Sequence, residues 1–177
     1  MKMKKSALII FFLIVVITII SQVNMHSQTK IKVGDKVPDF SLKDQFGNDF
    51  QITDHIGKTA MVIYFYPKDD TPGCTKEACT FRDSYTEFSD INVIVIGISS
   101  DSVKSHKNFA EKYNLPFTLL ADTKKEVRKL FGVPSNLLGL VPGRVTYVVD
   151  KQGYIIYIYN SMTNAEGHIE EALKALK

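Results

Sequence analysis

The chain has 177 residues, of which 45% are hydrophobic and 23% are charged, so it can bury a core of its own and is not typical of a disordered protein. Its formal net charge of +3 comes from Lys2, Lys4 and Lys5; without them, basic and acidic residues are equal in number. The charge balance therefore implies no basic face for binding nucleic acid, and two cysteines are too few for a scaffold held together by disulfides.

The first 21 residues have the pattern of an export signal. A basic start over residues 1–5 is followed by an apolar run that continues to Ile20. The run is shorter than a comfortable membrane span of ~20 residues, so a cleaved signal peptide and a retained membrane anchor both stay open. We predict an exported protein, either periplasmic or anchored facing outside the cytoplasm. Residues 22–30 form the predicted linker, and residues 31–177 form one domain.

Apolar patterns predict the elements of this domain in chain order. Two short strands around a turn form a hairpin, and an apolar, aromatic strand follows over residues 61–66. Residues 92–98 are almost wholly apolar, which is typical of a parallel strand buried on both faces. The predicted strands are 40–43, 49–52, 61–66, 92–98, 118–121, 144–149 and 154–159; the predicted helices are 72–88, 102–113, 124–131 and 165–177, with a loop over 132–143.

The order of these elements predicts the fold. After the two-stranded start, strands and helices follow one another as β-α-β-α-β-α-β-β-α. This is the thioredoxin-like arrangement with an insertion, an α/β fold whose mixed sheet is flanked by helices and extended by an amino-terminal hairpin.

Cys74 lies where a helix is predicted to begin. Thr71 is a suitable N-cap, and Pro72 occupies the first helical position, where its missing N–H costs nothing. Cys74 then falls in the first turn, where free backbone N–H groups and the helix dipole favour a thiolate. The position indicates a nucleophile, although a free cysteine is more often a small buried apolar residue.

The same residues carry a resemblance to a known family. Pro67-x-x-x-Thr71-x-x-Cys74 resembles the active-site motif of peroxiredoxins, and the string TPGCTKEACTFRD resembles their bacterioferritin-comigratory, peroxiredoxin Q-like branch. The likeness extends from about Lys32 to Lys177. It implies that Cys74 attacks peroxide, that Cys79 resolves the resulting sulfenic acid, and that no metal, haem or flavin is needed.

The resemblance also implies a catalytic arginine. It places Arg144, at the start of the penultimate strand, beside the thiolate, where a guanidinium would stabilise both the thiolate and the departing oxygen. Arg82 is expected instead to pair with carboxylates, and Arg128 to lie solvated on an exposed helix face. The Thr71 hydroxyl is expected to cap the helix, to bind peroxide, or to do both.

Two further predictions concern Pro67 and the cysteine pair. Pro67 is expected to end its strand and to shield the thiolate. Cys79 follows Cys74 by five residues, which in an intact helix puts their Cα atoms roughly 8–9 Å apart, whereas a disulfide needs less than about 7 Å. Oxidation is therefore expected to unwind the segment from about Pro72 to Thr80. The alternative is that Cys79 is a core residue and Cys74 works with an external thiol.

The remaining polar residues suggest no second site. The four histidines, at positions 26, 55, 106 and 168, show no metal-ligand spacing and are expected at the surface or at caps. Asp69, Asp70 and Glu77 are expected to be solvated. No glycine-rich phosphate loop is present, so neither a cofactor nor a metal is predicted.

These observations predict a thiol-dependent peroxidase that reduces hydrogen peroxide and organic hydroperoxides. Its expected partner is a thioredoxin-like dithiol reductant, with a possible membrane tether and a monomeric state. Two alternatives stay open. An exported thiol–disulfide oxidoreductase would need Cys-x-x-Cys at the helix start, whereas four residues separate Cys74 from Cys79. A copper-binding assembly protein would need a closer pair of cysteines and a histidine in the loop 132–143, which contains none.

Overall fold

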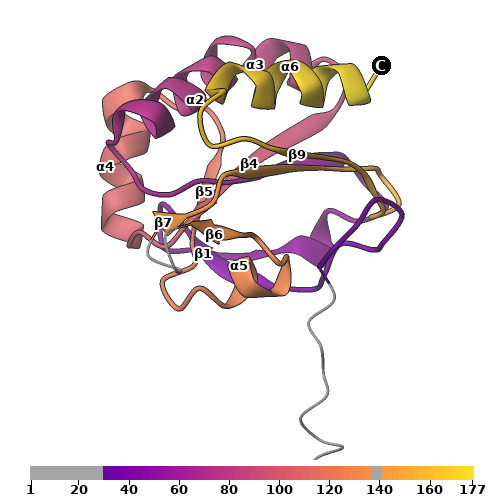
Figure 1. Ribbon diagram of the computed structural model, residues 1–177, viewed down its shortest axis with the longest axis horizontal. Helices are drawn as coiled ribbons and strands as arrows, with labels where there is room; N and C mark the ends of the chain where they lie inside the picture. The colour runs from indigo at the N-terminus through magenta and orange to yellow at the C-terminus, as the bar shows by residue number, and fades with distance from the viewer. Residues whose placement is uncertain (1–29, 137–140) are drawn as a thin grey trace, which may run out of the picture.

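Seven strands form one mixed sheet in the computed structural model, which describes residues 30–136 and 141–177 (Figure 1). The strand order is β2-β1-β5-β4-β3-β8-β9, and a separate pair, β6-β7, lies outside the sheet. The strands are β1 (Ser41–Asp44), β2 (Asp49–Gln51), β3 (Ala60–Phe65), β4 (Val93–Ser99), β5 (Thr118–Ala121), β6 (Ser135–Asn136), β7 (Val141–Pro142), β8 (Val145–Val149) and β9 (Ile155–Asn160).

The centre of the sheet is parallel and its flanks are antiparallel. β3 pairs with β4, and β4 with β5, in parallel; β8 runs antiparallel to β3 and β9 antiparallel to β8. Every residue of β3 after Ala60 is buried, because helices cover both faces of the sheet at this point. β3, the strand with the apolar run, therefore lies inside the sheet, as predicted. The motif loop, residues 66–71, follows its carboxyl end and leads into α2.

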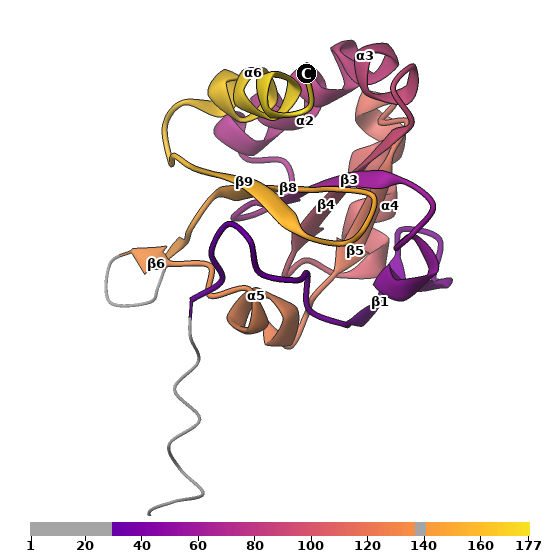
Figure 2. The same cartoon turned by 90° about the vertical axis from the view of Figure 1, so that its right-hand side faces the viewer.

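Helices form a layer on each face of the sheet (Figures 1 and 2). α2, α3, α4 and α6 cover one face, with Phe81, Phe88, Phe109 and Ile169 in one core cluster. α5 and the amino-terminal segment cover the other face, with Val127 and Phe40 in a second cluster. The helices are α2 (Pro72–Asp83), α3 (Tyr85–Ser89), α4 (Val103–Tyr113), α5 (Glu126–Leu130) and α6 (Ala165–Ala175), and a 3-10 turn, η1, spans Ile52–Asp54.

The predicted mixed α/β fold and its amino-terminal hairpin are confirmed, with three local differences. The predicted helix 72–88 is two helices, because the backbone at Ser84 leaves the helical region between α2 and α3. α5 begins later than predicted, because Lys125 has a left-handed backbone with φ of 59°. The predicted loop 132–143 contains the short β6-β7 pair.

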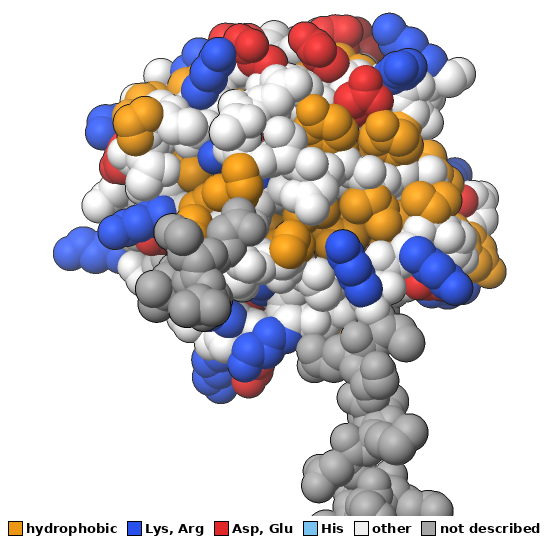
Figure 3. All heavy atoms as spheres, viewed as in Figure 1, with side chains coloured by type: hydrophobic (Ala, Val, Ile, Leu, Met, Phe, Trp, Pro, Cys, Tyr) orange, Lys and Arg blue, Asp and Glu red, His pale blue; other side chains and the backbone are white. Residues whose placement is uncertain are grey.

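The surface and the helices bear on two predictions about partners. On the face seen in Figure 3, Lys and Arg side chains are spread around the molecule and do not form one basic patch. None of the helices within residues 30–136 and 141–177 is long and apolar enough to cross a bilayer. The predicted signal or anchor, residues 1–21, lies outside the described residues.

Candidate active site

Cys74 is buried in the first turn of α2, directly beyond the carboxyl end of β3. Pro72 is the first residue of the helix, and Thr71 precedes it with an extended backbone, φ −87° and ψ 146°. The N–H of Thr75 donates to the Thr71 carbonyl at 2.8 Å, which closes the first turn. Cys74 is only 2% exposed, and it lies in the first turn, where the backbone N–H groups of a helix have no acceptor within the helix.

Arg144 lies against this sulfur. Its Nη2 donates to Cys74 Sγ at 3.4 Å, its Nη1 donates to the Gly73 carbonyl at 3.3 Å, and the side chain is buried. Gly73 makes room for the guanidinium, since a Cβ there would lie 3.2 Å from Arg144 Nη2. The antiparallel pairing of β3 and β8, in which Phe65 faces Val145, brings Arg144 to the same end of the sheet as Cys74.

Glu77 was expected to be solvated, and that expectation is wrong. It lies one helical turn after Cys74, on the face of α2 that packs onto the sheet and α6, and it is fully buried. Arg144 Nη1 donates to Glu77 Oε2. Burial raises the pKa of Glu77 to about 8, although the positive charge of Arg144 and its hydrogen bond oppose the rise. Glu77 can therefore change its charge next to Arg144 near neutral pH.

His168, on α6, was expected at the surface and is also fully buried. Its Nε2 lies 2.9 Å from the Ser161 carbonyl and so must donate to it, which leaves Nδ1 to accept from the Thr146 hydroxyl at 2.7 Å. Burial, together with a smaller contribution from the positive charge of Arg144, lowers the pKa of His168 to about 4, although the Ser161 hydrogen bond opposes the change. His168 is therefore neutral at physiological pH.

The neutral state of His168 predicts how acid affects stability. Between pH 6.5 and about 4 the unfolded chain binds a proton that the folded protein does not, so the free energy of unfolding falls as the pH falls through this range. The loss amounts to about 3 kcal/mol. In His168→Gln this contribution is absent, and the urea midpoint should depend less on pH. Equal pH slopes in the two proteins would contradict a neutral His168.

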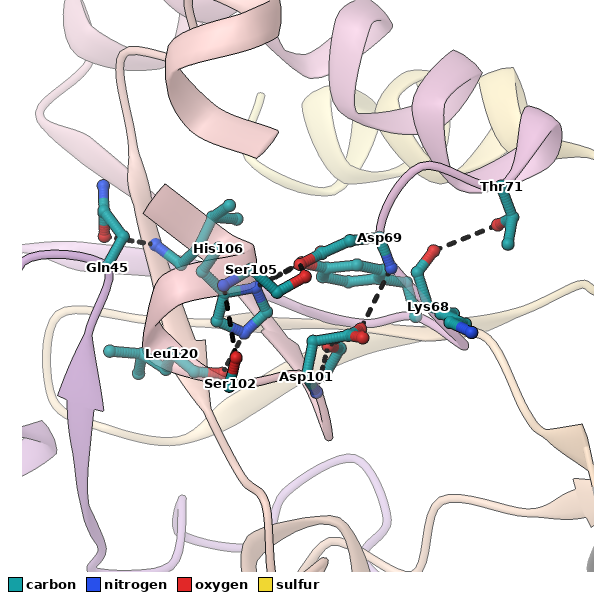
Figure 4. A network of polar contacts seen from close by, with 12 residues as sticks. Gln45, Lys68, Asp69, Thr71, Asp101, Ser102, Ser105, His106 and Leu120 are labelled. Carbon is teal, nitrogen blue, oxygen red and sulfur yellow. Dashed lines mark hydrogen bonds and ion pairs between the residues drawn. The ribbon is translucent and has the colours of Figure 1, made fainter. Parts of the chain in front are cut away.

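The loop between β3 and α2 is anchored by a buried polar network (Figure 4). Asp69 accepts hydrogen bonds from the Tyr66 and Ser105 hydroxyls, both at 2.7 Å, and pairs with His106 Nδ1 at 3.0 Å. His106 Nε2 lies 3.1 Å from the Leu120 carbonyl, so the loop is tied to α4 and to β5.

This network corrects two further expectations. Asp69 and His106 are both buried, although one was expected to be solvated and the other to lie at the surface. Burial alone would raise the pKa of Asp69, but the hydrogen bond and charge of His106 hold it below its ordinary value. The carboxylate therefore stays charged and keeps the motif loop in place. Asp70, as expected, is exposed, and it pairs with Lys112 at 2.7 Å.

Three other predicted residues lie close to Cys74 along the chain. Thr71 occupies the N-cap position, but its hydroxyl donates to the Lys68 carbonyl at 3.0 Å and makes no capping bond, so the predicted side-chain cap is wrong. Pro67 is half-buried at the start of the loop, and β3 ends two residues before it. Cys79 is half-buried on the same helix as Cys74, and both thiols are free.

Arg82 and Arg128, the two arginines not expected beside the thiolate, lie in different environments. Arg82 pairs with Asp83 at 2.8 Å, as expected. Arg128 was expected to be solvated, but it is buried and its guanidinium donates to two backbone carbonyls. α5 packs against the sheet, with Val127 in the core cluster of that face, and the neighbouring Arg128 is buried with it. Within the described residues, no group of three or more His, Cys, Asp or Glu side chains is placed to hold a metal ion.

Comparison with known proteins identifies the family. The model of the AhpC/TSA family matches residues 33–158. The chain belongs to this family. It is 53% identical to the chloroplastic peroxiredoxin Q of Sedum lineare over 148 residues, which cover 84% of this chain and 79% of that one. The peroxiredoxin Q of Arabidopsis thaliana is also 53% identical, with 84% and 68% covered.

Solved peroxiredoxins have the same fold. Peroxidoxin BcpB from Mycobacterium tuberculosis is 37% identical and superimposes with a TM-score of 0.77, covering 82% of this chain and 96% of that one. The bacterioferritin comigratory protein of Xanthomonas campestris is 32% identical, with a TM-score of 0.71 and coverage of 77% and 89%. The thioredoxin-like fold and the resemblance to the peroxiredoxin Q branch are confirmed, and this peroxiredoxin is a thiol-dependent peroxidase.

The predicted location is wrong. Relatives that share more than half of the aligned residues with the chain are named chloroplastic, not exported or periplasmic. The predicted membrane tether was assigned to residues 1–21, which lie outside the part of the chain that the structure describes. The basic and apolar pattern of residues 1–21 was the sole basis for both predictions.

Proposed function

We propose that Cys74 is the peroxidatic nucleophile and Arg144 its electrostatic partner. The observation that carries this is the 3.4 Å contact between Arg144 Nη2 and Cys74 Sγ in the first turn of α2. The thiolate attacks one peroxide oxygen, so an S–O bond forms, the O–O bond breaks, and water or an alcohol leaves after taking up a proton. Sulfur is oxidised to the sulfenic acid as the peroxide is reduced. The guanidinium stabilises negative charge on the leaving oxygen.

Thr71 and Pro67 complete this proposed site. Thr71 precedes the first helical residue, and its hydroxyl, now bonded to the Lys68 carbonyl, can turn to a bound peroxide. Pro67 begins the loop that encloses the sulfur and limits the access of water to it. We assign this chemistry to a single domain over residues 31–177, acting on hydrogen peroxide and organic hydroperoxides.

Cys79 is proposed to resolve the sulfenic acid. Its thiol attacks the Cys74 sulfur, an S–S bond forms, and water leaves; an external thioredoxin-like dithiol then reduces the disulfide by exchange. Both cysteines lie on α2, so the bond cannot form until the helix opens. The composition favours opening: Gly73, Thr75 and Thr80 are all weaker helix formers than alanine. The intramolecular bond offsets the cost, since Cys79 meets the sulfenic acid at high effective concentration.

Hydrogen exchange tests this mechanism. The amides of residues 72–80 should exchange slowly in the reduced protein, where α2 is intact, and quickly in the oxidised protein, where it has unwound. In Cys79→Ser the sulfenic acid should persist, over-oxidise more readily and need an added small thiol for turnover. Exchange measured by mass spectrometry, with a sulfenic-acid trap, provides both readouts.

The matched control is Thr80→Ser, which changes the neighbouring position of α2 and keeps both cysteines. It should behave as the wild type in both measurements. Equal protection in the two redox states, together with a Cys74–Cys79 disulfide confirmed by peptide mass, would show that the geometric argument is wrong. Unchanged thioredoxin-dependent turnover in Cys79→Ser would show that Cys74 works with an external thiol.

A further inference from the structure

Arg128 is a buried cation with carbonyls as its hydrogen-bond partners. Only 5% of the residue is exposed, and its Cζ lies 5.7 Å from the centroid of the Phe65 ring. Nη2 donates to the Tyr66 carbonyl at 2.9 Å and Nη1 to the Gly143 carbonyl at 3.1 Å. Within residues 30–136 and 141–177, no carboxylate forms an ion pair with it. Its charge is offset instead by the two carbonyls, by the Phe65 ring and by the attraction of the nearby Asp122 carboxylate.

The two carbonyls belong to the two segments that carry the active site. Tyr66 precedes Pro67, where the motif loop begins, and Gly143 precedes Arg144. The ladder between β3 and β8 ends at the pair Phe65 and Val145, just before both segments. From there on, the strands no longer bond to each other, and the planar guanidinium joins one carbonyl from each.

The backbone that carries Arg128 is itself held firmly. The Asp122 carboxylate, at the end of β5, accepts the N–H of Glu126 at 2.9 Å and the N–H of Arg128 at 2.8 Å. The N–H of Val133 donates to the Arg128 carbonyl at 3.1 Å. Gly143 is confined as well, since a Cβ there would lie 2.4 Å from the Pro134 carbonyl oxygen. The Arg128 guanidinium therefore extends from a firmly held backbone and joins the Tyr66 carbonyl to the confined Gly143 carbonyl.

We propose that Arg128 is a positioning residue for the peroxidase: by joining the Tyr66 and Gly143 carbonyls, it fixes where the Arg144 guanidinium lies relative to the Cys74 sulfur. The inference rests on the proposed roles of Cys74 and Arg144. It assigns a role to an arginine on the opposite face of the sheet from α2, which does not contact the sulfur. A single ammonium cannot replace it, because a lysine does not present two donors in a fixed plane.

The experiment compares Arg128→Lys and Arg128→Met with Lys129→Met, which removes an exposed positive charge from the neighbouring position of the same helix. All three are made in the Cys79→Ser background, so that only Cys74 reacts. Two rates are measured: single-turnover oxidation of Cys74 by hydrogen peroxide, and alkylation of Cys74 by iodoacetamide as a function of pH. Alkylation needs the thiolate but no stabilised leaving oxygen, so it reports on the sulfur without the help of Arg144.

Both Arg128 variants should be oxidised by peroxide at least about tenfold more slowly, since a small misplacement of a catalytic group costs one to two orders of magnitude. Their alkylation rates at high pH, where the thiolate is fully formed, should match the background protein, and Lys129→Met should match it in both reactions. If Arg128→Met does not fold, Arg128→Lys decides alone. Wild-type peroxide rates in Arg128→Lys, or an equal fall in both reactions, would overturn the inference.

This outcome is distinct from failure of the proposed function. If peroxide consumption survived in Cys74→Ser, the nucleophile itself would be misassigned, whatever Arg128 does. If Cys74 is the nucleophile but peroxide oxidation is indifferent to Arg128→Lys, then only the positioning role fails.

Discussion

Cys74→Ser is expected to abolish peroxide consumption while the protein stays folded. A serine hydroxyl is not ionised at neutral pH and cannot take up the oxygen as sulfur does, so no sulfenic acid forms. The fold should tolerate the change, because the side chain is of similar size and lies in the first turn of α2, next to Arg144. Turnover of hydrogen peroxide with dithiothreitol as reductant measures the effect.

Cys79→Ser is the matched control for this loss. It replaces the other cysteine of α2 by the same residue and should keep peroxide turnover with dithiothreitol, since a small thiol can reduce the Cys74 sulfenic acid directly. Activity above a few per cent of the wild type in Cys74→Ser, with Cys79→Ser inactive, would reverse the two assignments.

Arg144→Met is expected to slow the oxidation of Cys74 by peroxide by about 10² to 10³, the cost of removing one donor that stabilises a developing negative charge. It removes the donor that lies 3.4 Å from the sulfur. It also leaves the buried Glu77 carboxyl without its hydrogen-bond partner, which would destabilise the fold. The double variant Arg144→Met, Glu77→Gln puts an uncharged amide in place of that carboxyl and separates the catalytic loss from the loss of stability.

The control for this prediction is Arg82→Met, which removes an arginine that pairs with Asp83 near the end of α2. Single-turnover oxidation of Cys74, followed by stopped-flow fluorescence or quenched mass analysis, should be slow in both Arg144 variants and near the wild-type rate in Arg82→Met. Equal rates in the double variant and in Arg82→Met would show that Arg144 has no part in the chemistry.

The pKa of Glu77 gives the peroxidase site a dependence on pH that the sequence did not indicate. Below pH 8 the carboxyl is mainly protonated, so the charge of Arg144 faces the sulfur without a neutralising neighbour; above it, the carboxylate competes for the guanidinium. Glu77 on α2 and Arg144, just before β8, lie 67 positions apart, and the helical pattern alone predicts a solvated Glu77.

Some parts of the molecule follow from local sequence. The apolar run of β3, the Thr71–Pro72 helix start and the first-turn position of Cys74 depend on neighbouring residues alone, because helix starts and strand patterns are decided by backbone hydrogen bonds and side-chain alternation over a few positions. For the same reason the order of elements, and with it the thioredoxin-like fold, could be predicted from the chain.

Only the tertiary structure decided how charged residues are partnered. The sequence predicted solvated side chains for Asp69, Glu77 and Arg128, and all three are buried, because each finds a partner from a distant segment. A helical period shows which residues share a face, but not what will cover that face. That depends on the register of β3 with β8 and on where α4, α5 and α6 pack, which set the distances between groups far apart in the chain.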